Sequence, residues 1–408
     1  MKLTRKSMTV CMLSTVSLVL AFSLLGAAAS AVGIGSEPIF QLACPPLEGF
    51  WSDEPAPPKL RLKRWLSGQF QNKFDNWFSA HCGGRNPLIR MNNQILYALF
   101  RRSYMFQGRI AVCDSDALYM TNYLADYFHQ CNQQDIQLVS HFVSDLEQLQ
   151  NSLQKRGTAF VFLITPSKCK SLPPSISAPW DKRKIPDSRI YDELVRQLRE
   201  RNIQYVDGRQ ITSELESKKT AQTFTPGGIH WTQPAAAATF NEVLSKINKQ
   251  RTSQFPLIKT SAVSYGPPDA IERDLASILN LLTPNYNYKV EHAEFCPSDP
   301  AWKPSGKIVF EGTSFVEQLT TVAFRANMFS TMRHYFYYTT ALNIFPQVKK
   351  LDVNASTINW DHDILDADAV IIENNEGLPF DHCQHFVSDA LSHIKNSALA
   401  QNSAAQIR

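Results

Sequence analysis

Apolar and polar positions follow a helical period in the first part of the chain. Residues 74–104 carry apolar side chains at helical spacing, with Leu88, Met91, Ile95 and Leu99 as examples. This spacing predicts one or two helices. A second amphipathic segment ends near residue 157 and leads directly into an uninterrupted apolar run at 159–164. A short run of this kind is typical of a strand buried on both faces.

Units of the same kind recur further along the chain. They comprise a helix that Asp187 would cap, a strand at 203–206, a helix at 235–247, and strands at 308–310 and 369–372. Alternating helices and apolar strands predict an α/β fold of three layers around a mostly parallel sheet. We expect three parts: a signal peptide or anchor at 1–32, a Pro-rich N-terminal arm at 33–60, and one α/β domain at 61–400.

The N-terminus has the pattern of an export signal. An uncharged run at residues 7–36 contains the small-residue site Ala-Ser-Ala at 29–31, and it follows the basic residues Lys2, Arg5 and Lys6. Cleavage after Ala31 would give a soluble chain, whereas retention would leave one membrane anchor, and both outcomes stay open. In both cases we expect the chain from about Val32 onward to be exported.

Charge and glycine content exclude several function classes. The chain has 41 basic and 37 acidic residues, and beyond the three N-terminal cations the two signs are nearly equal. A nucleic-acid partner is not expected, because phosphate binding needs a concentrated basic surplus. With only 16 glycines and no GxxxxGK[ST], GxGxxG or HExxH motif, we expect no nucleotide or other cofactor and no zincin helix.

Eight cysteines occur, of which Cys11 lies in the signal. Seven remain, an odd number: Cys44, Cys82, Cys113, Cys131, Cys169, Cys296 and Cys383. An oxidising compartment allows up to three disulfides with one thiol left over, and the spacing leaves their connectivity open.

A candidate nucleophile follows the strand at 308–310. Ser314 lies in the sequence Glu-Gly-Thr-Ser-Phe, directly before a helix-compatible segment at 316–325. A serine at a strand-to-helix turn presents its hydroxyl at the carboxyl edge of a parallel sheet, beside helix N-terminal amides. The alternative is that Thr313 or Ser314 simply caps the helix.

A candidate general base lies in the loop at 226–232. His230 is followed by Trp231 and then by an alanine-rich helix. A histidine can accept a serine proton near neutral pH. A lone histidine is more often structural, and the pairing with Ser314 favours the catalytic interpretation.

Two further clusters have a structural interpretation that we favour. Metal-ligand residues occur at Asp361–Asp363 and at 381–385, where His382 and His385 suit one helix face. We expect a solvated polar face and no metal, because the four-residue separation of zincin histidines is missing. The aromatic run Tyr335–Tyr338 could stack on sugar rings, but a core strand is the favoured interpretation.

Five sequence blocks, taken in order, resemble the AlgX/AlgJ family of alginate O-acetyltransferases. They are Asn76–Phe78 with Arg85 and Leu88–Arg90, Phe162–Lys168 with Leu172-Pro173, His230-Trp231, Gly312–Phe315, and Asp368–Glu376. The resemblance implies an SGNH hydrolase-like domain in which the histidine block precedes the serine. It also implies periplasmic transfer of acetyl groups to an alginate-like exported polysaccharide, with Ser314 as nucleophile and His230 as base. The implied acetyl donor partner is a membrane-bound O-acyltransferase.

The sequence departs from this family at the position of the acid. The family has an aspartate two residues before the histidine, where this chain has Gly228. A triad needs an acid to orient the imidazole and to stabilise its cation. Three outcomes stay open: a Ser-His dyad, a substitute acid at Glu373 or Glu376, or a polysaccharide-binding scaffold that has lost catalysis. A carbohydrate acetylesterase is a further alternative, because it would share the acetyl-serine step.

Overall fold

A computed structural model describes residues 47–49, 56–81, 85–113, 116–174, 184–284, 287–377 and 379–406. The expected signal or anchor at 1–32 and most of the arm at 33–60 lie outside these ranges. Within them, no helix is both long and apolar enough to cross a membrane. Contacts divide the chain into two compact units, one of Met1–Ile110 with Leu275–Asn285 and one of Ala111–Asp274 with Tyr286–Arg408. The domain bounds predicted from the sequence stay a prediction.

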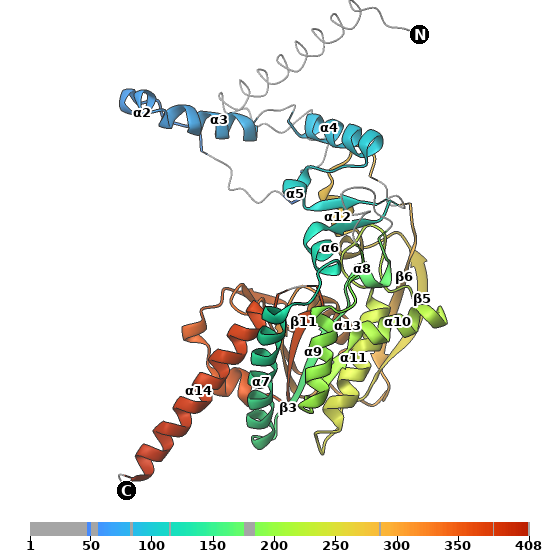
Figure 1. The fold of residues 1–408 in the computed structure, drawn as a ribbon, viewed down its shortest axis with the longest axis vertical. Helices are drawn as coiled ribbons and strands as arrows, with labels where there is room; N and C mark the ends of the chain where they lie inside the picture. Colours follow the sequence, from blue (N-terminus) through green and yellow to red (C-terminus); the bar gives the residue numbers. More distant parts are fainter. Residues whose placement is uncertain are drawn as a thin grey trace, which may run out of the picture. The chain divides into compact units, whose positions relative to one another are not determined.

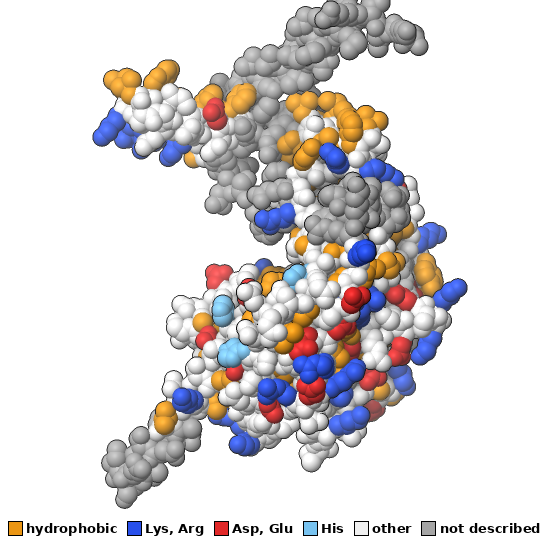
Figure 2. Space-filling model, viewed as in Figure 1, with side chains coloured by type: hydrophobic (Ala, Val, Ile, Leu, Met, Phe, Trp, Pro, Cys, Tyr) orange, Lys and Arg blue, Asp and Glu red, His pale blue; other side chains and the backbone are white. Residues whose placement is uncertain are grey.

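The first unit is helical. Its helices are α2 (Leu62–Leu66), α3 (Gln69–His81), α4 (Arg85–Phe100) and α5 (Met105–Gly108). The helices predicted within residues 74–104 are therefore confirmed. Inside this unit the buried Asn93 side chain donates to the carbonyl of Leu279 at 2.9 Å. Figure 2 shows hydrophobic side chains on the surface of α4, where Met91, Ile95 and Leu99 are exposed.

The second unit is built on a seven-stranded sheet with the order β10-β9-β8-β7-β11-β3-β4. Its strands are β3 (Ala159–Thr165), β4 (Tyr205–Asp207), β7 (Lys307–Gly312), β8 (Thr331–Phe336), β9 (Ala341–Phe345), β10 (Lys349–Leu351) and β11 (Ala369–Asn375). The five strands from β8 to β4 run parallel, and β9 and β10 extend the sheet as antiparallel edge strands. The mostly parallel sheet is thus confirmed. Every residue of β3 and β11 is buried, as expected of strands covered on both faces.

Helices cover both faces of this sheet (Figure 1). One face carries α7 (Gln133–Lys155), α9 (Ile190–Glu200) and α14 (Asp381–Gln406), and the other carries α10 (Gly208–Lys218), α11 (Gln233–Asn248) and α13 (Val316–Arg325). The start of α9 differs from the prediction. Arg189 is its N-cap, because the carboxylate of Asp192 in the first turn accepts the Arg189 backbone N–H at 2.9 Å.

Shorter elements complete the second unit. They are β1 (Ile110–Val112), β2 (Leu118–Met120), α6 (Thr121–Tyr127), α8 (Lys168–Ser171), β5 (Ile258–Gly266), η1 (Ala270–Arg273), β6 (Val290–Pro297), η2 (Ala355–Thr357) and η3 (Asp361–Leu365). Strands β5 and β6 pair antiparallel. Helix α12 (Asp274–Ile278) begins in the connection between them.

Cysteine pairing is resolved for part of the chain. Cys131, Cys169, Cys296 and Cys383 carry free thiols. Cys44 and Cys82 lie outside the described residues, so the number of disulfides stays open.

Candidate active site

Ser314 lies where β7 ends and α13 begins, at the carboxyl edge of the parallel strands. The residue before it, Thr313, is fixed from below by Glu373 of β11, whose Oε2 accepts from the Thr313 backbone N–H at 2.7 Å and from its hydroxyl at 2.9 Å. The Thr313 hydroxyl oxygen in turn accepts from the Phe315 N–H at 3.2 Å. These bonds hold the turn. The N-cap of α13 is Phe315 and no side chain caps the helix, so neither Thr313 nor Ser314 serves as its cap.

His230 is held against this turn by its neighbours. The fully buried Trp231 donates its indole N–H to the carbonyl of Phe315 at 3.0 Å, and the Gln318 side chain donates to the carbonyl of Trp231 at 3.3 Å. The next residue, Thr232, is the N-cap of α11. The histidine loop is therefore joined to the serine turn and to α13 by two hydrogen bonds at Trp231, the residue after His230.

Each nitrogen of the His230 ring has its own partner. Nε2 lies 2.7 Å from the hydroxyl oxygen of Ser314, and Nδ1 lies 2.7 Å from Oδ2 of Asp274. The other carboxylate oxygen of Asp274 accepts from the Ile229 backbone N–H at 2.9 Å. Ser314 is 84 positions from His230 and Asp274 is 44 positions from it. Proximity over such separations comes from the fold and not from local chain geometry.

Asp274 supplies the acid that the sequence leaves unassigned. A Ser-His dyad is not what the structure has, because an acid occupies the second ring nitrogen of His230. The acid also does not come from the position that Gly228 occupies. A Cβ placed on Gly228 would lie 2.7 Å from the carbonyl oxygen of Glu272 and 2.9 Å from the Thr225 hydroxyl, so no side chain fits there without a backbone shift. With an acid present, the main support for a non-catalytic scaffold is gone.

Glu373 and Glu376, the expected substitutes, are engaged elsewhere. Both are fully or almost fully buried. Glu373 binds the hydroxyls of Thr165 and Thr313, and burial raises its pKa. Glu376 accepts from the Ser167 N–H at 2.8 Å and from Arg209 at 3.1 Å, and burial raises its pKa to about 7. Both carboxyls therefore position loops at the sheet edge, and the expectation that either acts as the triad acid is wrong.

No recognisable signal in the sequence points to Asp274. It is one of several acids in a short stretch that also holds Asp269 and Glu272, and no motif or helical stripe distinguishes it. Its identification needs the long-range contact, which the pairing of β5 with β6 around it brings about.

A buried lysine supports the histidine loop. The ammonium group of Lys168 donates to three carbonyls, those of Pro226 and Gly228 at 2.7 Å and that of Leu118 at 2.9 Å. Three acceptors match the three hydrogens of an ammonium group. Burial lowers the Lys168 pKa to about 7, and the negative charge of Asp274 partly opposes this shift. In the sequence, Lys168 stands out only as part of a block that resembles the AlgX/AlgJ family.

Tyr337 brings a second hydroxyl to Ser314. It follows β8 in a left-handed backbone conformation with φ of 42°, and its N–H donates to the carbonyl of Gly312 at 2.8 Å. Burial raises the pKa of Tyr337, while hydrogen bonds with the side chain and the main chain of Ser314 work in the opposite direction. The phenol therefore remains protonated at neutral pH, next to Ser314. An uncommon backbone conformation of this kind is often found at functional sites.

The remaining clusters divide between core and surface. Tyr335 and Tyr338 are buried, as expected for the core interpretation of 335–338. Asp361 pairs with Arg156 at 3.0 Å on the surface. The expectation of a solvated face fails for His382 and Cys383, because Cys383 is fully buried and the His382 side chain is only 10% exposed.

Comparisons with known proteins address the family of the second unit. Residues 123–322 match the model of the family described as "ALGX: SGNH hydrolase-like domain, acetyltransferase AlgX". No curated protein matches the sequence.

Three solved structures illustrate what the chain is similar to. The O-acetyltransferase domain of Pseudomonas putida AlgJ is 15% identical, with 66% of this chain and 91% of that chain covered and a TM-score of 0.43. Pseudomonas aeruginosa AlgX is 13% identical, with 66% and 63% covered and a TM-score of 0.40. Bacillus cereus PatB1 is 9% identical, with 65% and 95% covered and a TM-score of 0.42.

The matched residues include His230, Asp274 and Ser314. The resemblance indicated by the sequence blocks is confirmed over residues 123–322, which match the SGNH hydrolase-like acetyltransferase domain of the AlgX family model.

Proposed function

We propose that this protein is an O-acetyltransferase that uses Ser314 to move acetyl groups onto hydroxyls of an exported, alginate-like polysaccharide. The observation that carries the proposal is the two-sided contact of His230, with Ser314 on Nε2 and Asp274 on Nδ1, each at 2.7 Å. An imidazole held in this way has the geometry needed to activate a serine.

In the first half-reaction His230 Nε2 takes the proton of the Ser314 hydroxyl. The serine oxygen attacks the carbonyl carbon of the acetyl donor, and the bond to the donor's leaving group breaks as His230 returns the proton to that group. Asp274 keeps the hydrogen of the imidazole on Nδ1 and stabilises the imidazolium. The product is acetyl-Ser314.

In the second half-reaction a sugar hydroxyl takes the place of the leaving group. It gives its proton to His230, attacks the acetyl carbon and releases Ser314, which recovers its proton from His230. Both tetrahedral intermediates carry an oxyanion. The Tyr337 hydroxyl, which lies next to Ser314, is the proposed donor to this oxyanion.

The cellular setting follows from the N-terminal pattern and the family. The basic start and uncharged run of residues 1–36 favour export, so we place the enzyme in the periplasm, soluble or anchored to the inner membrane. Its acetyl donor would then be supplied across the membrane, for which a membrane-bound O-acyltransferase is the proposed partner.

Transfer can be tested with a soluble acetyl ester and an unacetylated acidic oligosaccharide. The wild-type protein should give acetylated oligosaccharide, detected by mass spectrometry, and Ser314→Ala should not. Ser330→Ala is the matched control, because Ser330 is an exposed serine that bonds only to the carbonyl of Gly306 among the described residues. Release of free acetate without acetylated oligosaccharide would instead favour the acetylesterase.

A further inference from the structure

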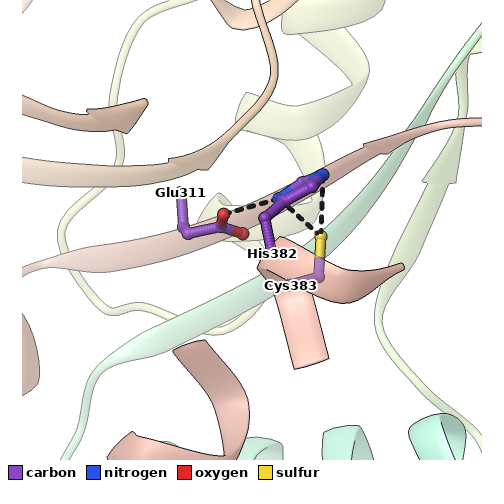
Figure 3. Close-up of side chains that lie close together, drawn as sticks. All are labelled: Glu311, His382 and Cys383. Carbon is purple, nitrogen blue, oxygen red and sulfur yellow. Dashed lines mark hydrogen bonds and ion pairs between the residues drawn. The ribbon is translucent and has the colours of Figure 1, made fainter. Parts of the chain in front are cut away.

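Three side chains with different ligand atoms meet behind the nucleophile turn. Glu311 is in the last part of β7, and His382 and Cys383 lie in the first turn of α14. Figure 3 shows the three side chains pointing toward one another. Nδ1 of His382 lies 2.7 Å from Oε1 of Glu311 and 3.3 Å from Sγ of Cys383. One ligand atom from each residue fits within a span of 4.8 Å.

The carboxylate of Glu311 is not fully satisfied by these neighbours. Glu311 is 0% exposed, and its Oε2 is buried without a hydrogen-bond donor among the residues that the structure describes. A buried carboxylate oxygen without a partner is costly, and such an atom needs an explanation. Burial raises the pKa of Glu311, and its contacts with His382 and with the Cys383 thiol oppose this only in part. An additional cation at this point would supply the missing partner.

The ligand set selects the kind of cation. Carboxylate oxygen, imidazole nitrogen and thiol sulfur together suit Zn²⁺, whereas Mg²⁺ and Ca²⁺ prefer oxygen ligands alone. In a tetrahedral zinc site, bond lengths of about 2.0–2.3 Å place neighbouring ligand atoms about 3.3–3.6 Å apart. The separation of 3.3 Å between His382 Nδ1 and Cys383 Sγ already matches this, and the pair at 2.7 Å would need to open by about half an ångström.

We propose that Glu311, His382 and Cys383 form a zinc-binding site that fastens the start of α14 to the end of β7. Binding releases the proton of the Cys383 thiol, since the thiolate is the ligand, and leaves the imidazole hydrogen of His382 on Nε2.

The position of this site links it to the nucleophile turn. Glu311 precedes Ser314 by only two intervening residues, and the His382 ring packs edge-on against Tyr337 with centroids 5.4 Å apart. Zinc would therefore hold His382, whose ring packs against Tyr337, and Glu311 at the end of β7. Its role is structural, and it takes part in no step of acetyl transfer.

A second group of ligand residues in the described ranges, Asp269, Glu272 and His292, provides a built-in contrast. It contains no sulfur, and Asp269 is exposed. A spectroscopic signal that requires thiolate therefore distinguishes the proposed site from this one.

Cobalt(II), which replaces zinc and absorbs light, tests the proposal in the purified full-length chain. After treatment with a chelator and its removal, Co²⁺ should bind at one equivalent and give a thiolate-to-cobalt charge-transfer band. Cys383→Ser should lose this band. Cys131→Ser, which changes a free thiol in a loop, should keep it.

Glu311→Gln keeps the shape of the side chain, so a loss of zinc binding in this variant does not have to come from unfolding. With circular dichroism unchanged, its zinc affinity should fall at least about 100-fold, because loss of an outer partner alone costs about 10- to 100-fold. A folded wild-type chain without the thiolate band at one equivalent of Co²⁺ would overturn the proposal. An unchanged band in folded Cys383→Ser would overturn it equally.

Discussion

At the residue scale, the acid of the site comes from a part of the chain far from the histidine block. Asp274 bonds both to the ring of His230 and to the backbone N–H of Ile229, so it fixes the ring and the loop that carries it. The contact with the loop means that Asp274 also positions the base before any substrate arrives.

Replacing Asp274 tests this role. Asp274→Asn should lower the turnover number by about four orders of magnitude with little change in KM, because the amide favours the wrong imidazole tautomer. Acetyl-ester kinetics measure the effect. Asp269→Asn removes an exposed acid from the same stretch and should leave turnover close to wild type. Equal turnover in the two variants would remove Asp274 from the mechanism.

Gly228 supports the site through its lack of a side chain. Gly228→Ala should destabilise the fold by roughly 1–3 kcal/mol, the usual cost of overpacking, because the added Cβ would meet the backbone of Glu272 at 2.7 Å. Displacement of Glu272 would also move Asp274, so activity per folded molecule should fall. Urea unfolding and ester kinetics measure the two effects, and a fully stable, fully active Gly228→Ala would contradict the tight packing described here.

At the element scale, buried polar side chains tie together the loops at the carboxyl edge of the sheet. Lys168 joins the start of α8 to the histidine loop, and Glu373 joins β11 to the serine turn. Glu376 joins the end of β11 to Ser167 and to Arg209 of α10. The edge is thus held by groups whose charge depends on pH.

Glu376 gives a pH dependence with a defined sign. Its pKa is raised from 4.5 in the unfolded chain to about 7 in the fold, so between these values the folded state binds the proton that the unfolded state has lost. Stability from this group is therefore fully present below about pH 4.5 and is lost as the pH rises to about 7. The total change is roughly 3 kcal/mol at most.

Comparison of wild type with Glu376→Gln isolates this effect. The stability of the wild type relative to the variant, measured by urea unfolding at each pH, should fall from pH 4.5 to 7 and then level off. Glu147→Gln, which removes an exposed carboxylate paired with Arg201, controls for the change of net charge. A difference between wild type and Glu376→Gln that does not vary with pH would show that burial does not perturb this carboxyl.

At the scale of the whole molecule, the periodic parts of the chain were predictable and the contacts of the site were not. Apolar runs and helical spacing predict strands β3, β7 and β11 and helices α7, α11 and α13. These strands are buried in the sheet, and each of these helices buries one apolar face, so burial leaves a clear pattern in the sequence. Strand β5 was missed because most of its residues are exposed, which leaves no alternation to detect.

The candidate site shows the same division. Ser314 and His230 were identified because each stands at an element boundary beside recognisable neighbours. Asp274 was not, since its role depends on a contact over 44 positions. The prediction of a substitute at Glu373 or Glu376 failed because both strand-end carboxyls are used for packing the loops.

Export can be tested on the whole chain. A reporter that is active only outside the cytoplasm, fused after Arg408, should be active, because three basic residues precede the uncharged run. Changing Lys2, Arg5 and Lys6 to Glu should reduce this activity. A second reporter, which is active only in the cytoplasm, should be inactive at the same position. Activity of this second reporter would contradict the proposed export to the periplasm.

The proposed mechanism requires that Ser314 becomes acetylated, and peptide mass spectrometry after brief incubation with an acetyl ester detects this directly. We expect one added acetyl group on the peptide that contains Ser314 and none in Ser314→Ala. Little should form in His230→Ala, because the hydroxyl then lacks its base. The opposite result has two parts: the wild type turns over the ester without an acetyl group on Ser314 in acid-quenched samples, and Ser314→Ala turns it over equally fast. This result would contradict the role of Ser314 as nucleophile.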